Sequence, residues 1–299
     1  MTRKEKKESK AGARIISPIE AKTSKMRLIY GIMLAILIVA AALCLFPTLW
    51  VLLSAFKNIE EFVQIPPTII PKSFEPHKLA EAWDKTDFGN SYLNTIYMGL
   101  GEIVFSITFN GLAGYVLSRL KPKGVSLVFT VILWTMMMPS SVTMVPMFMT
   151  FIDFPLFHWN LTNTFWPFWL MAGANAFYIM LFKSFFDSIH MSYLESARID
   201  GCSELGIFAR IIVPMSKPIM VVVAIFVMNG TWGSFLWPFL LLNKESMLTT
   251  GIKIYKIRSI VSLDVYYMAL IFVIIPPALT YIFFQKYFME GLSLGGIKG

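Results

Sequence analysis

Residues 192–218 read Ser-Tyr-Leu-Glu-Ser-Ala-Arg-Ile-Asp-Gly-Cys-Ser-Glu-Leu-Gly-Ile-Phe-Ala-Arg-Ile-Ile-Val-Pro-Met-Ser-Lys-Pro, a polar stretch within an otherwise strongly apolar chain. Ser192 and Glu195 predict a capping box at the start of a short helix. Gly201 has the position of a left-handed residue that ends this helix. Ser203 predicts the cap of a second helix. We interpret these residues as a docking element and refer to them below as the docking stretch.

The second helix of the docking stretch is predicted to bury one apolar face. Its apolar residues recur at helical spacing at Leu205, Phe208, Ile211 and Ile212. Glu204 lies in the first turn, near the positive end of the helix dipole. Pro214 is expected to stop the helix. A helix this short is marginal alone, so we expect something else to hold it.

A spaced pattern runs through the same residues. The pattern EAA---G---------I-LP is matched at Glu195, Ala197, Gly201, Ile211 and Pro214. Two positions differ, because Ser196 replaces an alanine and Val213 replaces a leucine. Through this pattern the chain resembles the permease subunits of binding-protein-dependent ABC importers. The resemblance implies a cytoplasmic coupling helix that sits in a cleft of an ATPase subunit, with candidate coupling residues Glu195, Ser196, Ala197, Asp200, Gly201, Ile211 and Pro214.

The composition excludes an ordinary soluble domain. The 299 residues are 56% hydrophobic and 15% charged, whereas globular chains carry about 25% charged residues. Several apolar runs reach the ~20 residues that span a bilayer. Cys44 lies in such a run and Cys202 in the docking stretch, so neither a disulfide framework nor a metal site is expected. We therefore predict an all-α, polytopic membrane protein.

Six transmembrane helices are predicted. They cover roughly residues 28–56, 91–118, 125–151, 165–186, 218–242 and 264–285. Prolines are expected to interrupt three of them, as static kinks or as hinge and path positions, at Pro139 and Pro146, at Pro238, and at Pro276 and Pro277.

The predicted domain organisation follows from these helices. Residues 1–27 form a basic tail, 28–56 the first transmembrane helix and 57–90 an external loop. Residues 91–285 form a five-helix transport core that contains the coupling loop 187–217, and 286–299 form a C-terminal tail.

Charge predicts the orientation in the membrane. The tail at residues 1–27 carries nine Lys or Arg and three Glu, and the connector after the second helix carries Arg119, Lys121 and Lys123. An excess of basic residues marks the cytoplasmic side, which places both termini and the docking stretch in the cytoplasm. The resemblance implies the inner membrane of a bacterium. The basic residues of the connector at 243–263 oppose this orientation, but the first helix and short flanks dominate the bias.

The sequence holds no nucleotide-binding loop of the type G-x-x-x-x-G-K-[ST] and no hydrolase or metalloprotease motif. The chain is therefore not expected to be an enzyme or to bind a cofactor or a metal. The resemblance implies that ATP and Mg²⁺ are bound by partner ATPase subunits.

Polar groups at membrane depth predict a translocation path. The fifth helix contributes Asn229, Thr231, Trp232, Ser234 and Trp237, and the second contributes Glu102, since an intramembrane carboxylate usually faces protein or a cavity. The alternatives stay open. Gly230 and Gly233 also suit close helix packing, Trp237 suits an interfacial anchor, and Glu102 suits a structural hydrogen bond.

The end of the chain, FQKYFMEGLSLGGIKG (284–299), follows the type FQ+YF--GL--GA-KG. It resembles the second permease of the pair in the carbohydrate-uptake branch of the same family, where this tail lies near the ATPases. A pattern of type WN-F--P is echoed at Trp232, Phe235 and Pro238, with Gly233 in place of the asparagine. The glycines at 291, 295, 296 and 299 are expected to prevent a stable helix.

These resemblances imply a permease subunit that forms half of the path of an ATP-driven importer for sugars or oligosaccharides. The implied partners are a second homologous permease, two ATPase subunits, an extracellular or periplasmic solute-binding protein and the lipid bilayer, and no nucleic acid is expected. Another cargo, such as glycerol phosphate, is the nearest alternative. An ion-coupled secondary transporter and a scaffold protein are more distant ones. The sequence decides neither which sugar is carried nor whether this subunit touches it.

Overall fold

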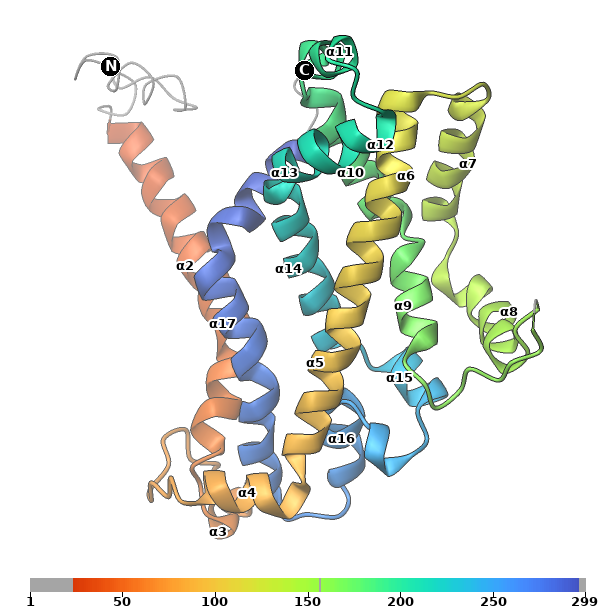
Figure 1. Ribbon diagram of the computed structural model, residues 1–299. Coiled ribbons are helices and arrows are strands. Elements are labelled where there is room, and N and C mark those ends of the chain that lie inside the picture. Colours follow the sequence, from red (N-terminus) through yellow and green to blue (C-terminus); the bar gives the residue numbers. More distant parts are fainter. Residues whose placement is uncertain (1–23, 156, 296–299) are drawn as a thin grey trace.

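The computed structural model describes residues 24–155 and 157–295, and in this part of the chain it is built from helices (Figure 1). The only pairing of β type among these residues is an isolated bridge between Phe154 and Trp159. Most of the predicted basic tail (residues 1–23) and the last four residues of the predicted C-terminal tail lie outside the described residues.

Within the described residues, three helices are long and apolar enough to cross a membrane without a break. The first is α2 (Ser24–Ser54), and the last is α17 (Leu263–Gly295), which lies beside it. The second runs from Phe88 to Leu120. It consists of α5 (Phe88–Phe105), the π turn η2 (Ser106–Asn110), α6 (Gly111–Tyr115) and the π turn η3 (Val116–Leu120).

Three further segments are bent helix pairs. The pair α7 (Val125–Met137) and α8 (Ser140–Ile152) bends by 105°, and the pair α9 (Trp166–Gly173) and α10 (Ala176–Ser188) bends by 41°. The third pair joins residues 204–215 to α14 (Lys217–Gly233) with a bend of 70°. If each pair counts as one span, the described residues contain six spans. The predicted all-α membrane architecture is thus confirmed.

The predicted interruption of the fifth helix, 218–242, near Pro238 is confirmed. Helix α14 ends at Gly233, Ser234 is extended, and the short α15 (Leu236–Leu241) begins two residues later. Pro238 explains this break, because it has no N–H and cannot continue the helix from Ser234. With the break upstream, Pro238 falls in the first turn of α15, where a missing N–H costs nothing.

The expected interruption at Pro276 and Pro277 is wrong, because α17 runs through both prolines. Two prolines free the carbonyls of Phe272 and Val273, four residues earlier. The Tyr92 hydroxyl donates a hydrogen bond to the first carbonyl, and the Trp232 indole Nε1 donates to the second at 3.2 Å. Side chains from neighbouring helices therefore replace the lost backbone bonds, as membrane helices require.

The glycines near the C-terminus do not prevent a helix either. Helix α17 continues through Gly291 to Gly295. A glycine costs about 1 kcal/mol relative to alanine in a helix interior, which is too little to end a helix of 33 residues. This part of the predicted flexible tail is thus helical.

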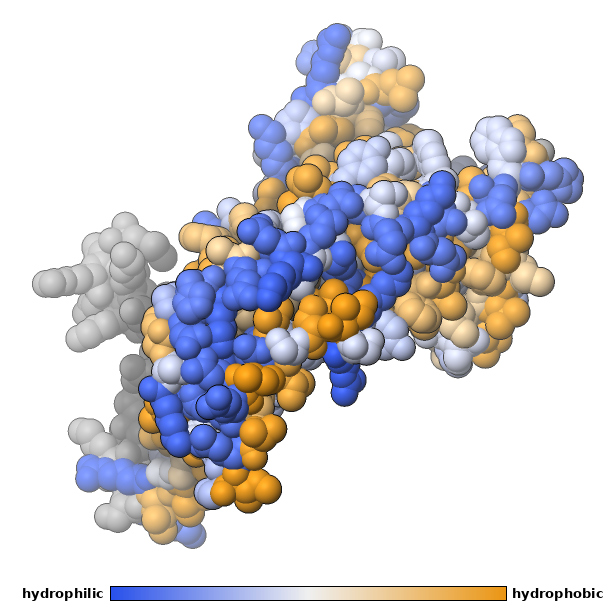
Figure 2. All heavy atoms as spheres, turned by 90° about the horizontal axis from the view of Figure 1, so that it is seen from below, coloured by the Kyte–Doolittle hydropathy of each residue, from blue (hydrophilic) through white to orange (hydrophobic). Residues whose placement is uncertain are grey.

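The predicted loops hold short helices that close one end of the molecule. The external loop contains α3 (Ile59–Phe62) and α4 (Lys78–Thr86), and the connector at 243–263 contains η5 (Glu245–Met247) and α16 (Thr250–Ile257). Figure 2 views this end of the molecule and shows hydrophilic residues spread across it around a smaller apolar group. This surface suits water more than lipid.

Both ends of the described chain lie at the opposite end of the molecule. Figure 1 places the start of α2, the end of α17 and the α6–α7 connector there, together with α11 (Met191–Ile199). The docking stretch and both ends of the described chain are therefore on one side. That this side is the cytoplasm stays a prediction.

Close helix packing joins this end to the spans. A Cβ atom on Gly114 would lie 2.7 Å from Cβ of Phe182 and 3.0 Å from the backbone N of Lys183. Only glycine lets α6 and α10 approach this closely. The buried cluster around this contact also takes in side chains of the docking stretch, namely Leu194, Ala197, Ile207 and Ile212.

Candidate functional site

The docking stretch forms two helical segments joined at Gly201. Helix α11 ends in a Schellman motif, in which Gly201 N donates to Arg198 O at 3.0 Å and Cys202 N donates to Ala197 O at 2.9 Å. Gly201 has φ +79°, so the predicted left-handed conformation is confirmed. The predicted cap of the second segment is confirmed as well, because Ser203 Oγ accepts from Gly206 N at 3.2 Å.

The predicted capping box at Ser192 is wrong. Helix α11 begins at Met191 and its N-cap is His190, which makes no side-chain cap bond. Ser192 therefore lies inside the first turn, where its hydroxyl is 3.3 Å from the His190 ring. Glu195 makes no hydrogen bond back to this cap, and its side chain is exposed.

The second segment comprises α12 (Glu204–Ile207), the π turn η4 (Phe208–Ile212) and α13 (Val213–Met215). Leu205 was expected on the apolar face, but it is 79% exposed and Ile207 is buried in its place. The π turn changes the helical repeat, so spacing of 3.6 residues does not carry across it. Pro214 lies in the first turn of α13, and the bend follows it at Ser216.

Several contacts hold the docking stretch as one unit. The Arg198 guanidinium donates from Nε to Glu204 Oε1 at 2.8 Å and so joins the two segments. Glu204 also accepts from the Tyr115 hydroxyl of α6 at 3.5 Å. Leu194 and Ala197 of α11 are buried in the core cluster. The stretch is therefore attached to the spans rather than loosely tethered.

The outer side of the docking stretch is partly apolar. Ile199 is 86% exposed, and Leu205 and Tyr193 are also exposed. Among the predicted coupling residues, Ala197 is buried and Ile211 is half-buried. Those at the surface are Glu195, Ser196, Asp200, Gly201 and Pro214. Whether these residues contact an ATPase stays a prediction.

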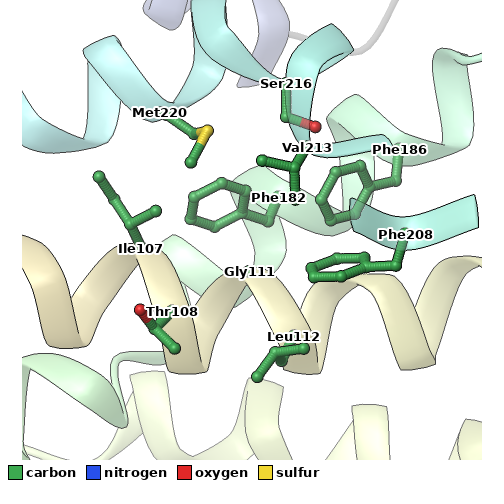
Figure 3. Close-up of a pocket in the computed structure, with 10 residues that line it drawn as sticks. All are labelled: Ile107, Thr108, Gly111, Leu112, Phe182, Phe186, Phe208, Val213, Ser216 and Met220. Carbon is green, nitrogen blue, oxygen red and sulfur yellow. The ribbon is translucent and has the colours of Figure 1, made fainter. Parts of the chain in front are cut away.

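An apolar cavity of about 240 Å³ adjoins the bend (Figure 3). Figure 3 shows the rings of Phe182, Phe186 and Phe208 turned towards this space between the docking stretch and the second span. The Ser216 hydroxyl at the bend donates to Ile212 O at 2.5 Å, so it offers no free polar group. The cavity leaves room for packing changes at the bend, and its lining carries no reactive group.

A second pocket, of about 230 Å³, lies where α5, the α9–α10 break and the end of α14 meet, and we call it the central pocket. Four predicted path residues line it, namely Glu102, Thr231, Ser234 and Trp237. The Thr231 hydroxyl donates a hydrogen bond to the Glu102 carboxylate. Side chains far apart in the sequence thus meet at one site.

Sequence reasoning missed the contribution of the α9–α10 break. Asn175 and Tyr178 also line the central pocket. Asn175 Oδ1 caps α10 by accepting from Phe177 N at 3.0 Å and Tyr178 N at 3.2 Å, and Asn175 N donates to Asn110 Oδ1 at 3.0 Å. The sequence feature that could have revealed this break is Asn175 itself, because asparagine is a preferred N-cap residue and here it lies inside an apolar run.

The other two predicted path residues, Asn229 and Trp232, face away from the central pocket. Both line a separate space against Pro276 and Pro277 of α17. Asn229 Nδ2 donates to Ile225 O of its own helix at 3.0 Å, and the buried Trp232 bonds to Val273 O. Their contacts are those of structural residues.

The hydrogen bond of Trp232 leads to a stability prediction. The change Trp232→Phe is expected to lower the free energy of unfolding by about 1–3 kcal/mol, because it leaves the part-buried carbonyl of Val273 without a donor. Thermal unfolding of the purified protein in detergent measures the effect. Trp134→Phe is the matched control, because Trp134 is exposed on α7. Equal stability of the two variants would contradict the role assigned to Trp232.

No group of three or more His, Cys, Asp or Glu side chains that could bind a metal occurs within residues 24–155 and 157–295.

Comparisons with known proteins place these features in a family. The family model described as "Binding-protein-dependent transport system inner membrane component" matches residues 106–293. The chain is 31% identical over 263 residues to an arabinooligosaccharides transport system permease of Bacillus subtilis. The match covers 86% of this chain and 92% of that protein. It is 29% identical over 284 residues to a diacetylchitobiose uptake system permease of Streptomyces coelicolor, with 93% and 92% covered.

Two further matches widen the comparison. An sn-glycerol-3-phosphate transport system permease of Yersinia pestis is 29% identical over 269 residues, with 86% of this chain and 93% of that protein covered. The fold is similar to that of one chain in a solved structure of a bacterial ABC transporter involved in the import of the acidic polysaccharide alginate. The TM-score is 0.76 at 24% identity, and the match covers 89% of this chain and 99% of that chain.

Proposed function

We propose that this chain, which belongs to the family of inner membrane components of binding-protein-dependent transport systems, is an oligosaccharide permease subunit of an ABC importer. The observation that carries the proposal is the docking stretch, which is attached rigidly to the spans and presents exposed apolar side chains on its outer side. Exposed apolar groups beside charged ones are typical of a surface that contacts another protein.

The helices offer a direct route from the docking stretch to the central pocket. Helix α14 begins after the bend at Ser216 and ends at Gly233, between Thr231 and Ser234 of the pocket. Its 17 residues extend over about 25 Å. When the ATPase pair closes, the docking stretch moves as one unit and α14 carries the movement to the pocket. Access to the pocket then alternates between the two sides of the membrane.

The partners follow from this mechanism. A second homologous permease supplies the other half of the path, and two ATPase subunits bind ATP and Mg²⁺, for which this chain has no phosphate-binding loop. A solute-binding protein delivers cargo at the end that carries α3, α4 and α16. In this arrangement the docking stretch and both termini face the cytoplasm of the bacterial cell.

The expected driving force gives the test of this function. Proteoliposomes that contain the complete complex and its solute-binding protein are expected to accumulate radiolabelled arabinotriose or diacetylchitobiose only when hydrolysable ATP is present. A non-hydrolysable ATP analogue provides the control, and ionophores should leave the uptake unchanged. Uptake that follows an ion gradient without ATP would instead support a secondary transporter.

A further inference from the structure

The central pocket has an unusual charge. Of the residues that line it, Glu102 alone is ionisable near neutral pH, and the others are Phe168, Met171, Ala172, Asn175, Tyr178, Val227, Gly230, Thr231, Ser234 and Trp237. No lysine, arginine or histidine is among them. The carboxylate is therefore not neutralised by a cation in the pocket wall.

The nearest basic residues along these helices are engaged or distant. Lys183 of α10 is bonded to Asp187 at 2.7 Å and lies over the Phe129 ring at 5.0 Å. Lys217 is at the opposite end of α14, about 21 Å along the helix from Thr231. Neither side chain lines the central pocket.

Helix ends of both signs meet at the central pocket. Helices α9 and α14 end there at Gly173 and Gly233, and a helix C-terminus carries partial negative charge. Helices α10 and α15 start there with their positive ends. The first two free amides of α10, of Phe177 and Tyr178, already donate to Asn175 Oδ1.

We propose that Glu102 makes the central pocket selective by charge, so that it accepts neutral or amino sugars and excludes anionic cargo such as uronates and sugar phosphates. The proposal rests on the proposed function and specifies its cargo. A carboxylate accepts hydrogen bonds from hydroxyl or ammonium groups, and the ring of Trp237 offers an apolar face for a pyranose or furanose. A phosphate or uronate would meet a like charge and no basic partner.

Charged thiol reagents measure the potential at this site directly. The variant Ser234→Cys places a thiol in the central pocket, in a background where Cys44 and Cys202 are replaced by serine. The purified complex in detergent is treated with a cationic trimethylammonioethyl or an anionic sulfonatoethyl methanethiosulfonate. The ratio of the two labelling rates is the readout, because any effect of Glu102 on the pKa of the thiol cancels in it.

The expected ratio favours the cationic reagent by at least about tenfold over that for a free thiol, as expected for a cleft lined by one sign of charge. Adding Glu102→Gln, which keeps the shape and removes the charge, should return the ratio to the free-thiol value. Ser246→Cys, at an exposed site in the loop before α16, is the control whose ratio Glu102→Gln should not change.

Two results would overturn the proposal. One is a ratio at position 234 that is the same with Glu102 and with glutamine. The other is the absence of labelling by either reagent both with and without ATP, since a cargo site must be reachable in one state. The uptake experiment on neutral oligosaccharides is independent of both. Its failure would refute the proposed function, whereas a failed labelling test with intact uptake refutes only the charge selectivity.

Discussion

The change Ile199→Asp is expected to reduce ATP-driven uptake by roughly 30- to 700-fold while leaving the fold of the permease intact. Ile199 is 86% exposed at the end of α11 and makes no contribution to the core of this chain. If an ATPase subunit covers it, a charge there loses a central apolar contact worth about 2–4 kcal/mol, and each 1.4 kcal/mol is a factor of ten in affinity.

The matched control for Ile199→Asp is Ile260→Asp. Ile260 is also exposed, at 77%, but it follows α16 at the opposite end of the molecule. Uptake by proteoliposomes, the amount of ATPase that copurifies and the melting temperature are measured for both variants. The control should match the wild type in all three. If Ile199→Asp retains both uptake and ATPase, the docking stretch has been assigned to the wrong role.

A change at Ile199 tests docking more directly than a change at Gly201, although Gly201 matches the family pattern. A Cβ atom on Gly201 would meet nothing within 4 Å, so a side chain there could block a partner. However, Gly201 has φ +79°, and any other residue would strain the Schellman motif that ends α11. A loss of uptake in a Gly201 variant would therefore mix a local folding defect with a docking defect.

Local sequence signals predicted the local structure of the docking stretch well. The left-handed Gly201 and the Ser203 cap depend on residues within one or two turns, so their neighbours in sequence suffice. The capping box failed because α11 begins two residues earlier than a cap at Ser192 requires. The prediction of the apolar face of the second segment failed because the π turn at 208–212 changes the helical repeat.

Tertiary contacts explain why the interruption predicted at Pro276 and Pro277 does not occur. Pro276 and Pro277 look like helix breakers in isolation, and the side chains that replace the lost bonds are Tyr92 and Trp232. Tyr92 is 180 residues away from its partner Phe272 in the sequence. No local pattern reveals such a pairing, so the sequence alone could not show that α17 is continuous.

The sequence shows only in part which of the predicted path residues line the central pocket. The polar run of the fifth span was treated as one surface, and the structure divides it between two sides of α14. Residues two apart on a helix differ by about 200° in direction, so Asn229 and Thr231 point nearly opposite ways. Helix geometry predicts that division. It does not predict that Glu102 of another helix meets Thr231.

A buried ion pair at the other end of the molecule gives the second large prediction. Lys78 Nζ of α4 donates to Asp264 Oδ2 of α17 at 3.0 Å, to Asn58 Oδ1 at 2.9 Å and to Glu75 Oε2 at 3.1 Å. The side chains of Lys78 and Asp264 are only 10% and 12% exposed. Burial opposes the charge of Lys78, but its bonds to Asp264 and Glu75 prevail and raise its pKa.

The change Lys78→Met is expected to destabilise the protein by about 3–5 kcal/mol, because it leaves the charge of Asp264 buried without a cationic partner. The double change Lys78→Met and Asp264→Leu should recover most of this loss, since a buried pair and an apolar pair are often similar in stability. Reversible unfolding in mixed detergent micelles measures all variants, and a double-mutant cycle isolates the coupling.

An exposed ion pair nearby separates the effect of burial from that of charge. Lys85 and Glu81 of α4 lie 2.5 Å apart at exposed positions of the same helix. Lys85→Met should therefore cost no more than about 0.5 kcal/mol. If the double variant of Lys78 and Asp264 is as unstable as the sum of its single changes, the two residues are not coupled. Helix α4 would then be held to α17 by its apolar contacts alone, through Ala82 and Trp83 against Phe272 and its neighbours.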